Sequence, residues 1–122
     1  MINSQESKPK YDLEERTFRF AKDVRSFVKT LPKTTANFED VKQLVRASGS
    51  DGANYIEANE SLGKKDFMMK IKICRKESKE SAYFLRLINE SNYLEKRDEA
   101  ERLIGEAIEL KKIFSSIIEK SK

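Results

Sequence analysis

The sequence predicts an all-α protein that folds as an antiparallel up-down-up-down four-helix bundle. The chain has 122 residues, the usual size of one domain. Charged and apolar residues each make up 38%, and only 4 glycines and 2 prolines interrupt the chain, a balance typical of long amphipathic helices. Apolar residues recur at helical spacing in four segments joined by short connections, and such helices pack as antiparallel neighbours.

The first ten residues are polar, so residues 1–10 are expected to form a flexible tail and residues 11–122 the bundle. A first helix is predicted over about residues 12–31. It should end near Leu31, because the residue before a proline is disfavoured in helical conformation and Pro32 follows. Its apolar face comprises Leu13, Phe20, Ala21, Val24, Phe27, Val28 and Leu31.

A second helix is predicted over residues 37–59, with Asn37 as its N-cap and acidic residues in its first turn. Two glycines, Gly49 and Gly52, fall within it, and each costs about 1 kcal/mol relative to alanine. They mark either a loop that splits the helix or a place where another helix approaches closely, and the pattern leaves both open. The inner face is predicted to comprise Val41, Leu44, Val45, Ser48, Ala53, Tyr55 and Ile56.

The third and fourth helices are predicted over residues 64–89 and 95–120. The core face of the third comprises Phe67, Ile71, Cys74, Ser78, Ala82 and Leu85. The stripe of the fourth comprises Ala100, Leu103, Ile104, Ala107, Ile108, Lys111, Phe114 and Ile118.

The chain contains no histidine and one cysteine, Cys74. Catalytic triads and zinc sites that need histidine are therefore excluded, and we expect no enzymatic activity, metal or cofactor. Because Cys74 has no partner for a disulfide within the chain, a reducing, cytoplasmic location is expected. Cys74 is predicted to face the core, so it is expected to be a packing residue. No run approaches the roughly 20 apolar residues of a membrane span, so no membrane association is expected.

The third helix carries most of the excess positive charge. Residues 64–79 contain seven basic and two acidic residues, although the whole chain has a net charge of only +4. At about 100° per residue, several bases fall opposite the core face, together with Tyr83. Such a face either contacts nucleic acid, RNA or DNA, or is simply solvated. This basic stripe comprises Lys65, Lys72, Lys76, Lys79 and Arg86.

The same helix has more apolar surface than one core face requires. An apolar flank, separate from the core face, predicts either self-association or a helix that lies between two neighbours of its own bundle. This apolar flank comprises Met69, Ile73, Phe84 and Leu87.

The second helix carries Arg46, Asn54 and Glu57 near one face, which makes them a candidate polar motif. The simplest interpretation is a structural one, since a glutamate beside an arginine usually forms an ion pair that sets helix register. A small-molecule or metal site built on Glu57 and Arg46 is disfavoured, because metal sites in bundles normally recruit histidine as well.

Residues 11–90 resemble a family of four-helix bundle proteins encoded within intervening sequences of bacterial 23S ribosomal RNA genes. The order and spacing of several short motifs carry the resemblance, although Gly63 replaces a frequent serine, which weakens a helix N-cap, and Asn-Tyr-Ile-Glu-Ala replaces Asn-Ile-Ala-Glu-Gly. The motifs are DLEERTFRFA at Asp12–Ala21, LPK at Leu31–Lys33, RAS at Arg46–Ser48, NYIE at Asn54–Glu57 and KKDF at Lys64–Phe67.

The resemblance implies a ring-shaped homopentamer without established enzymatic activity, and it favours a continuous second helix. A related accessory protein of diversity-generating retroelements binds nucleic acid and a reverse transcriptase. We therefore expect a non-enzymatic, oligomeric protein that binds nucleic acid through the basic stripe. The alternative is a structural or adaptor protein whose basic face binds an acidic protein partner.

Overall fold

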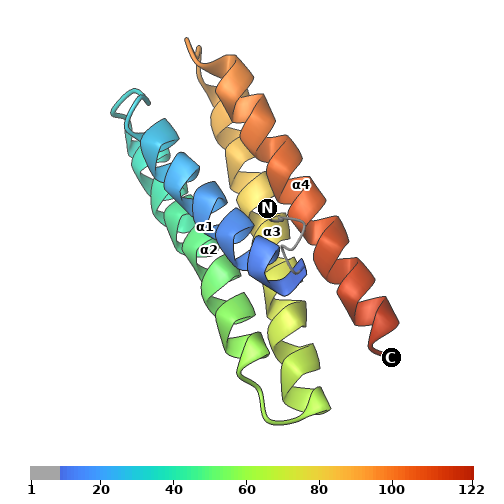
Figure 1. The fold of residues 1–122 in the computed structure, drawn as a ribbon. Coiled ribbons are helices and arrows are strands. Elements are labelled where there is room, and N and C mark those ends of the chain that lie inside the picture. Colours follow the sequence, from blue (N-terminus) through green and yellow to red (C-terminus); the bar gives the residue numbers. More distant parts are fainter. Residues whose placement is uncertain (1–8) are drawn as a thin grey trace.

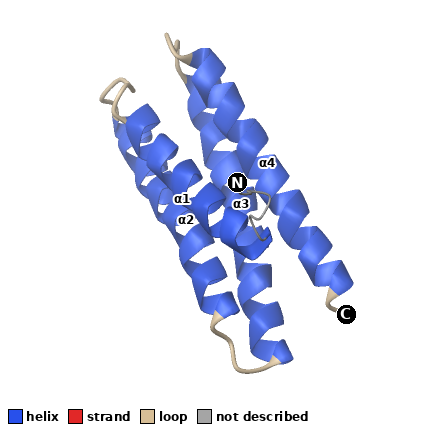
Figure 2. Cartoon of the chain, viewed as in Figure 1, coloured by secondary structure: helices blue, strands red, loops and turns tan. Residues whose placement is uncertain are grey.

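The computed structural model describes residues 9–122 and contains four helices. These are α1 (Pro9–Val28), α2 (Thr35–Asn59), α3 (Lys64–Ser91) and α4 (Arg97–Lys120). In Figure 1 the chain ascends through α1, descends through α2, ascends through α3 and descends through α4. No strand is present in this part of the chain (Figure 2). The predicted four-helix bundle is confirmed.

Each helix packs against the next one in the sequence. The contacts of α3 with α2 and with α4 are the most extensive, and α1 lies mainly against α2. Where α1 meets α4, polar pairs contribute: the Arg16 guanidinium binds both carboxylate oxygens of Glu106 at 2.7 and 2.9 Å, and Arg102 reaches Asp23 at 2.9 Å. Two ion pairs therefore join α1 to α4.

The core is built from the predicted faces with small changes. Leu110 is fully buried, although the predicted stripe of α4 omitted it, whereas Ile104, Ile108 and Lys111 are only half-buried at its margin. The apolar core comprises Leu13, Phe20, Val24, Phe27, Leu31, Leu44, Tyr55, Ala58, Ile71, Cys74, Leu85, Ile88, Ala100, Leu103, Ala107, Leu110, Phe114 and Ile118.

Both ends of the first helix differ from the prediction. α1 already includes Pro9 and Lys10, which were assigned to the flexible tail, while residues 1–8 of that tail lie outside the described residues. At its other end α1 stops at Val28, because the Thr30 amide and hydroxyl both bind the Phe27 carbonyl oxygen, at 3.0 and 2.7 Å, in a tighter turn.

The predicted N-cap of α2 is wrong. The cap is Thr34, whose hydroxyl oxygen accepts a hydrogen bond from the Asn37 amide at 3.1 Å. Asn37 is itself buried, and its side-chain amide donates to the Pro32 carbonyl at 2.8 Å and to Asn92 Oδ1 at 2.9 Å. Asn37 therefore ties the α1–α2 connection to the end of α3.

α2 is continuous through its two glycines, which settles the question that the pattern left open. The reason is a close helix contact. A Cβ atom on Gly52 would lie 2.8 Å from Thr17 Oγ1 of α1 and 3.1 Å from Thr17 Cβ. Thr17 is buried, and its hydroxyl donates to the Leu13 carbonyl at 2.9 Å, so it has little freedom to move away.

Continuity also corrects the predicted inner face of α2. Because the helix keeps about 100° per residue past the glycines, Asp51, Tyr55 and Ala58 follow Leu44 and Ser48 into the core. Ala53 and Ile56, which were predicted to face inward, are exposed beside α1 instead.

Replacing Gly52 by alanine should destabilise the protein by about 1–3 kcal/mol, because overpacking against Thr17 outweighs the better helix propensity of alanine. Gly105→Ala is the matched control: a Cβ there meets nothing within 4 Å, so the substitution should stabilise by up to about 1 kcal/mol. Urea unfolding monitored by circular dichroism measures both. Equal effects of the two substitutions would contradict the close contact.

Candidate functional site

The basic stripe lies along the exposed outer face of α3. Lys65, Lys72, Lys79 and Arg86 follow one another at intervals of seven residues, which is two helical turns or about 10.5 Å along the axis. All of them are exposed. They therefore form a slowly winding row of cations along about three quarters of the helix.

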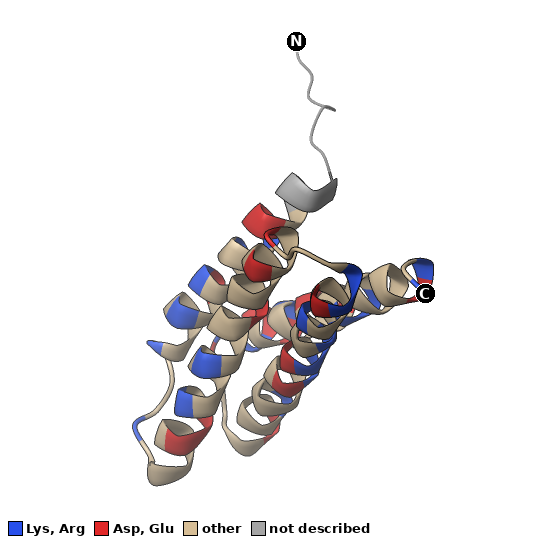
Figure 3. Cartoon of the chain, turned by 90° about the horizontal axis from the view of Figure 1, so that it is seen from below, with Lys and Arg blue, Asp and Glu red and all other residues tan. Residues whose placement is uncertain are grey.

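Few acidic groups neutralise this row. Among the side chains of residues 13–122, Lys65, Lys72 and Lys79 make no ion pair. Lys76 lies 3.9 Å from Glu77, and Arg86 lies 3.7 Å from Glu90. The Arg86–Glu90 pair is long and exposed at both ends, so it is worth little and an incoming anion can replace it. Glu77 is buried, but the side chain of Lys76 itself remains 62% exposed. A second basic stretch runs along α1 and its connection to α2, where residues 16–33 hold six basic residues and one acidic residue. On the rest of the bundle, residues of both signs are interspersed (Figure 3).

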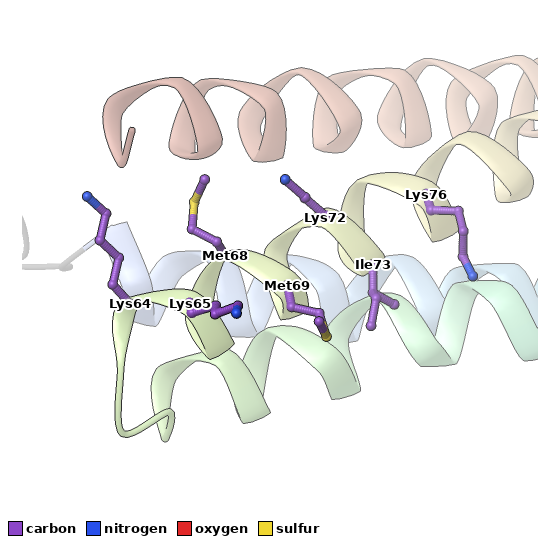
Figure 4. A pocket seen from close by; sticks show the side chains of 7 residues that line it. All are labelled: Lys64, Lys65, Met68, Met69, Lys72, Ile73 and Lys76. Carbon is purple, nitrogen blue, oxygen red and sulfur yellow. The ribbon is translucent and has the colours of Figure 1, made fainter.

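Apolar side chains occur within the basic stripe. A hollow at the start of α3 has a floor of Met68, Met69 and Ile73, and its rim consists of four lysines (Figure 4). In this view Met68 and Lys72 point to the side of α4, whereas Met69 and Ile73 point to the side of α2. The rim comprises Lys64, Lys65, Lys72 and Lys76. Over this half of α3 the basic stripe and the apolar flank therefore interleave.

The remaining members of the apolar flank lie in the second half of α3. Phe84 is partly buried against the core, and its ring makes an edge-to-face contact with Tyr83, with centroids 5.2 Å apart and an interplanar angle of 84°. Leu87 is exposed beside Tyr83 and Arg86, with which it lines a shallow hollow. Phe84 is therefore the member of the flank most engaged with its own bundle.

The polar motif of α2 does not converge on one site. Arg46 reaches across to α3, where it lies 2.7 Å from Glu80 and 3.4 Å from Glu77. Glu57 instead lies 3.2 Å from Lys70, and Asn54 bonds within α2 to the Ser50 carbonyl at 2.9 Å. Each side chain has its own partner, and two of the three join α2 to α3.

The buried polar cluster between α2 and α3 was missed by sequence reasoning. The Asp51 carboxylate is fully buried; one oxygen accepts a hydrogen bond of 2.5 Å from the Ser78 hydroxyl, and the other has no partner. Burial, and secondarily the charge of Glu77, raise the pKa of Asp51 from 3.8 to about 7, although the Ser78 bond opposes this. An aspartate flanked by small residues in a helix pattern gave no signal of burial.

Cys74 belongs to the same cluster and is buried, in line with its predicted packing role. Its Sγ donates to the Asp51 carbonyl oxygen at 3.3 Å. Burial, followed by the proximity of Asp51, raises the pKa of this thiol well above its usual range. The thiol is therefore neutral and unreactive at physiological pH.

A second apolar hollow lies between α1 and α2, and sequence reasoning missed it too. Phe18 is 63% exposed on α1 and Ile56 is 51% exposed on α2, and between them Ala21, Ala53 and Gly52 line what we name the α1–α2 groove. The available signal was Phe18, a large apolar residue that falls outside the spacing of the core face of the first helix.

The described residues contain no group of three or more cysteine, aspartate or glutamate side chains placed to hold a metal ion. None of the four helices is long and apolar enough to cross a membrane. What this surface offers chemically is a row of permanent cations with apolar contacts between them, an arrangement suited to binding an anion.

Known proteins resemble this chain over most of the bundle. The family described as 23S rRNA-intervening sequence protein matches residues 10–116. A crystal structure of a protein of unknown function, from the S23 ribosomal protein family of Bacteroides thetaiotaomicron, superimposes with a TM-score of 0.77 at 30% identity, covering 86% of this chain and 96% of that one. No curated protein matches the chain. The predicted resemblance is confirmed, and the chain belongs to the 23S rRNA-intervening sequence protein family.

Proposed function

We propose that this protein is a non-enzymatic nucleic-acid-binding protein that contacts phosphates through the basic stripe of α3. The observation that supports the proposal is the row of Lys65, Lys72, Lys79 and Arg86, in which the three lysines lack acidic partners among the side chains of residues 13–122. Lysine and arginine that neutralise phosphates release counterions, so binding of this kind does not require a specific sequence and weakens with salt.

Self-assembly strengthens the proposal, because a single stripe of about five cations binds weakly at physiological salt. Several stripes on one particle raise the apparent affinity by orders of magnitude if they engage together. We propose a homopentamer, the assembly that the family resemblance implies. Light scattering after size-exclusion chromatography should give about five times the mass of one chain, with nucleic acid co-purifying until a high-salt wash.

A closed ring requires two different surfaces on each subunit, because successive subunits meet head to tail. Two apolar surfaces are available on different helices: the floor of the α3 hollow, where Met69 is 57% exposed, and the α1–α2 groove around Ile56. We propose that the first surface of one copy packs into the second surface of its neighbour. Lys79 and Arg86, in the other half of α3, then stay open to nucleic acid.

The triple substitution Lys72→Glu, Lys76→Glu, Lys79→Glu should abolish binding to RNA and DNA at physiological salt, because it replaces three attractive charges by three repulsive ones. Fluorescence anisotropy with labelled oligonucleotides measures the effect, and circular dichroism checks that helicity is unchanged. Because Lys72 and Lys76 border the proposed contact between subunits, a second variant, Lys79→Glu with Arg86→Glu, changes only cations outside that contact. This second variant should also weaken binding while light scattering shows an unchanged mass.

The matched control reverses three exposed lysines outside α3, at Lys29, Lys33 and Lys42, so that the net charge changes equally. It should keep most of the affinity. Equal loss in both variants would mean that only overall charge matters, and unchanged binding of the α3 variant would overturn the role of the basic stripe.

The alternative is an adaptor whose partner is an acidic protein. The α3 hollow favours it, because an apolar floor within a lysine rim also suits an amphipathic acidic helix. Pull-down from lysate with and without nuclease separates the two functions, since only a link through nucleic acid disappears on digestion.

A further inference from the structure

We propose that Tyr83 is a stacking platform for an unpaired nucleobase, so that the basic stripe prefers single-stranded nucleic acid to a duplex. This inference rests on the proposed function and specifies the ligand of the same surface. It starts from one residue: Tyr83 is a large aromatic side chain that is 58% exposed on the outer face of α3.

The position of Tyr83 relative to the cations is the first argument. Lys79 precedes Tyr83 by four residues and Arg86 follows it by three, and side chains at these separations lie on the same side of a helix. A base that stacks on the ring therefore has a cation within reach of its phosphate on either side. Arginine and lysine around an exposed aromatic ring are the usual composition of single-strand binding surfaces.

The second argument is that the ring is already held in place. Tyr83 packs edge-to-face with Phe84, which in turn is partly buried against the core. A side chain that is restrained before binding loses less conformational entropy when a ligand arrives. Beside the ring, Arg86, Leu87 and Glu90 line the shallow hollow in which a stacked base would lie.

The shape of α3 explains the preference for single strands. In a duplex the faces of each base are covered by the neighbouring bases of the stack. A tyrosine on the outer face of α3 therefore meets only the sugar and phosphate groups of a duplex. In a single strand the bases are free to turn toward the protein, and every base has a face that can stack. Tyr83 therefore adds affinity for a single strand and adds little affinity for a duplex.

Anisotropy titrations with single-stranded RNA and DNA of about 20 nucleotides, and with duplexes of the same length, test the proposal. We expect Tyr83→Ala to weaken single-strand binding about 5- to 100-fold and to leave duplex binding and its salt dependence unchanged. Tyr83→Phe should retain the affinity, because stacking needs the ring and not the hydroxyl. Tyr83→Leu should behave as Tyr83→Ala, although it preserves apolar contact with Phe84.

Tyr93 provides the matched control, because it is a fully exposed tyrosine after α3 and outside the basic stripe. Tyr93→Ala should bind like the parent protein. If Tyr83→Ala binds single strands as tightly as the parent, or weakens single-strand and duplex binding equally, the stacking role is overturned while phosphate binding survives. If the parent protein binds neither form, the proposed function fails as well. Tighter binding of single-stranded RNA than of single-stranded DNA, or the reverse, identifies which nucleic acid the protein prefers.

Discussion

Replacing Asp51 by asparagine should raise the free energy of unfolding at pH 8 by up to about 4 kcal/mol, the energy equivalent of moving the pKa of the carboxyl from 3.8 to about 7. The carboxyl is fully buried and has one hydrogen bond, to Ser78, so its charged form is poorly solvated. Asparagine has nearly the same shape and carries no charge, so it avoids this cost.

The direction of the pH dependence follows from the raised pKa. Below about pH 4, Asp51 is protonated in both the folded and the unfolded chain, and its contribution to stability is complete. Between about pH 4 and pH 7 the unfolded chain releases the proton while the folded chain keeps it. The stability contributed by Asp51 therefore falls as pH rises through this window, and it stays low above about pH 7.

Urea unfolding of the parent protein and of Asp51→Asn at several pH values between 4 and 8 measures this effect. The difference between the two proteins isolates Asp51 from other titrating groups, and it should grow with pH up to about 7. Asp40→Asn, which removes a carboxyl from a half-buried position in the same helix, is the control. A constant difference for Asp51→Asn would contradict a protonated buried carboxyl.

Met69→Glu and Ile56→Glu should each convert the proposed ring into monomers, because each places a charge in one of the two apolar surfaces of the contact. Both side chains are more than half exposed in the isolated chain, at 57% and 51%, so neither substitution should unfold it. Light scattering should show the mass of one chain for each variant.

A mixture of the two variants provides the stricter test. Ile56→Glu retains an intact α3 surface and Met69→Glu retains an intact α1–α2 groove, so the pair can form one normal contact and should yield a heterodimer that does not grow further. If each variant still assembles, these surfaces are not the contact. If the mixture stays monomeric while the parent protein is a ring, the two surfaces do not pack against each other.

The fold was predictable because it depends on periodicity. Leu44, Ile71 and Phe114 recur with their neighbours at helical spacing, and proline and polar connections separate the four stretches, so the number of helices and most of their core faces followed directly. The cations of the basic stripe are all exposed on α3, as expected, since seven-residue spacing turns by only about 20° per step and keeps side chains in one sector of a helix. Their role in binding remains a prediction.

Several features could not be derived in this way, because they depend on what lies on a neighbouring helix. Asn37 resembles an N-cap until Asn92, 55 residues away, becomes its partner. Gly52 resembles a helix breaker until Thr17 approaches it. Asp51 resembles a surface residue until α3 brings Ser78 and Cys74 against it.

The sequence by itself determined the class of fold, the membership of the 23S rRNA-intervening sequence family and the position of the basic stripe, because each depends on residue types and their spacing along one segment. Only the tertiary structure decided that Phe18 and Ile56 border a groove, that Asn37 pairs with Asn92, and that a carboxyl is buried. Those features arise where two helices meet, and side-chain packing between helices sets which residues face each other.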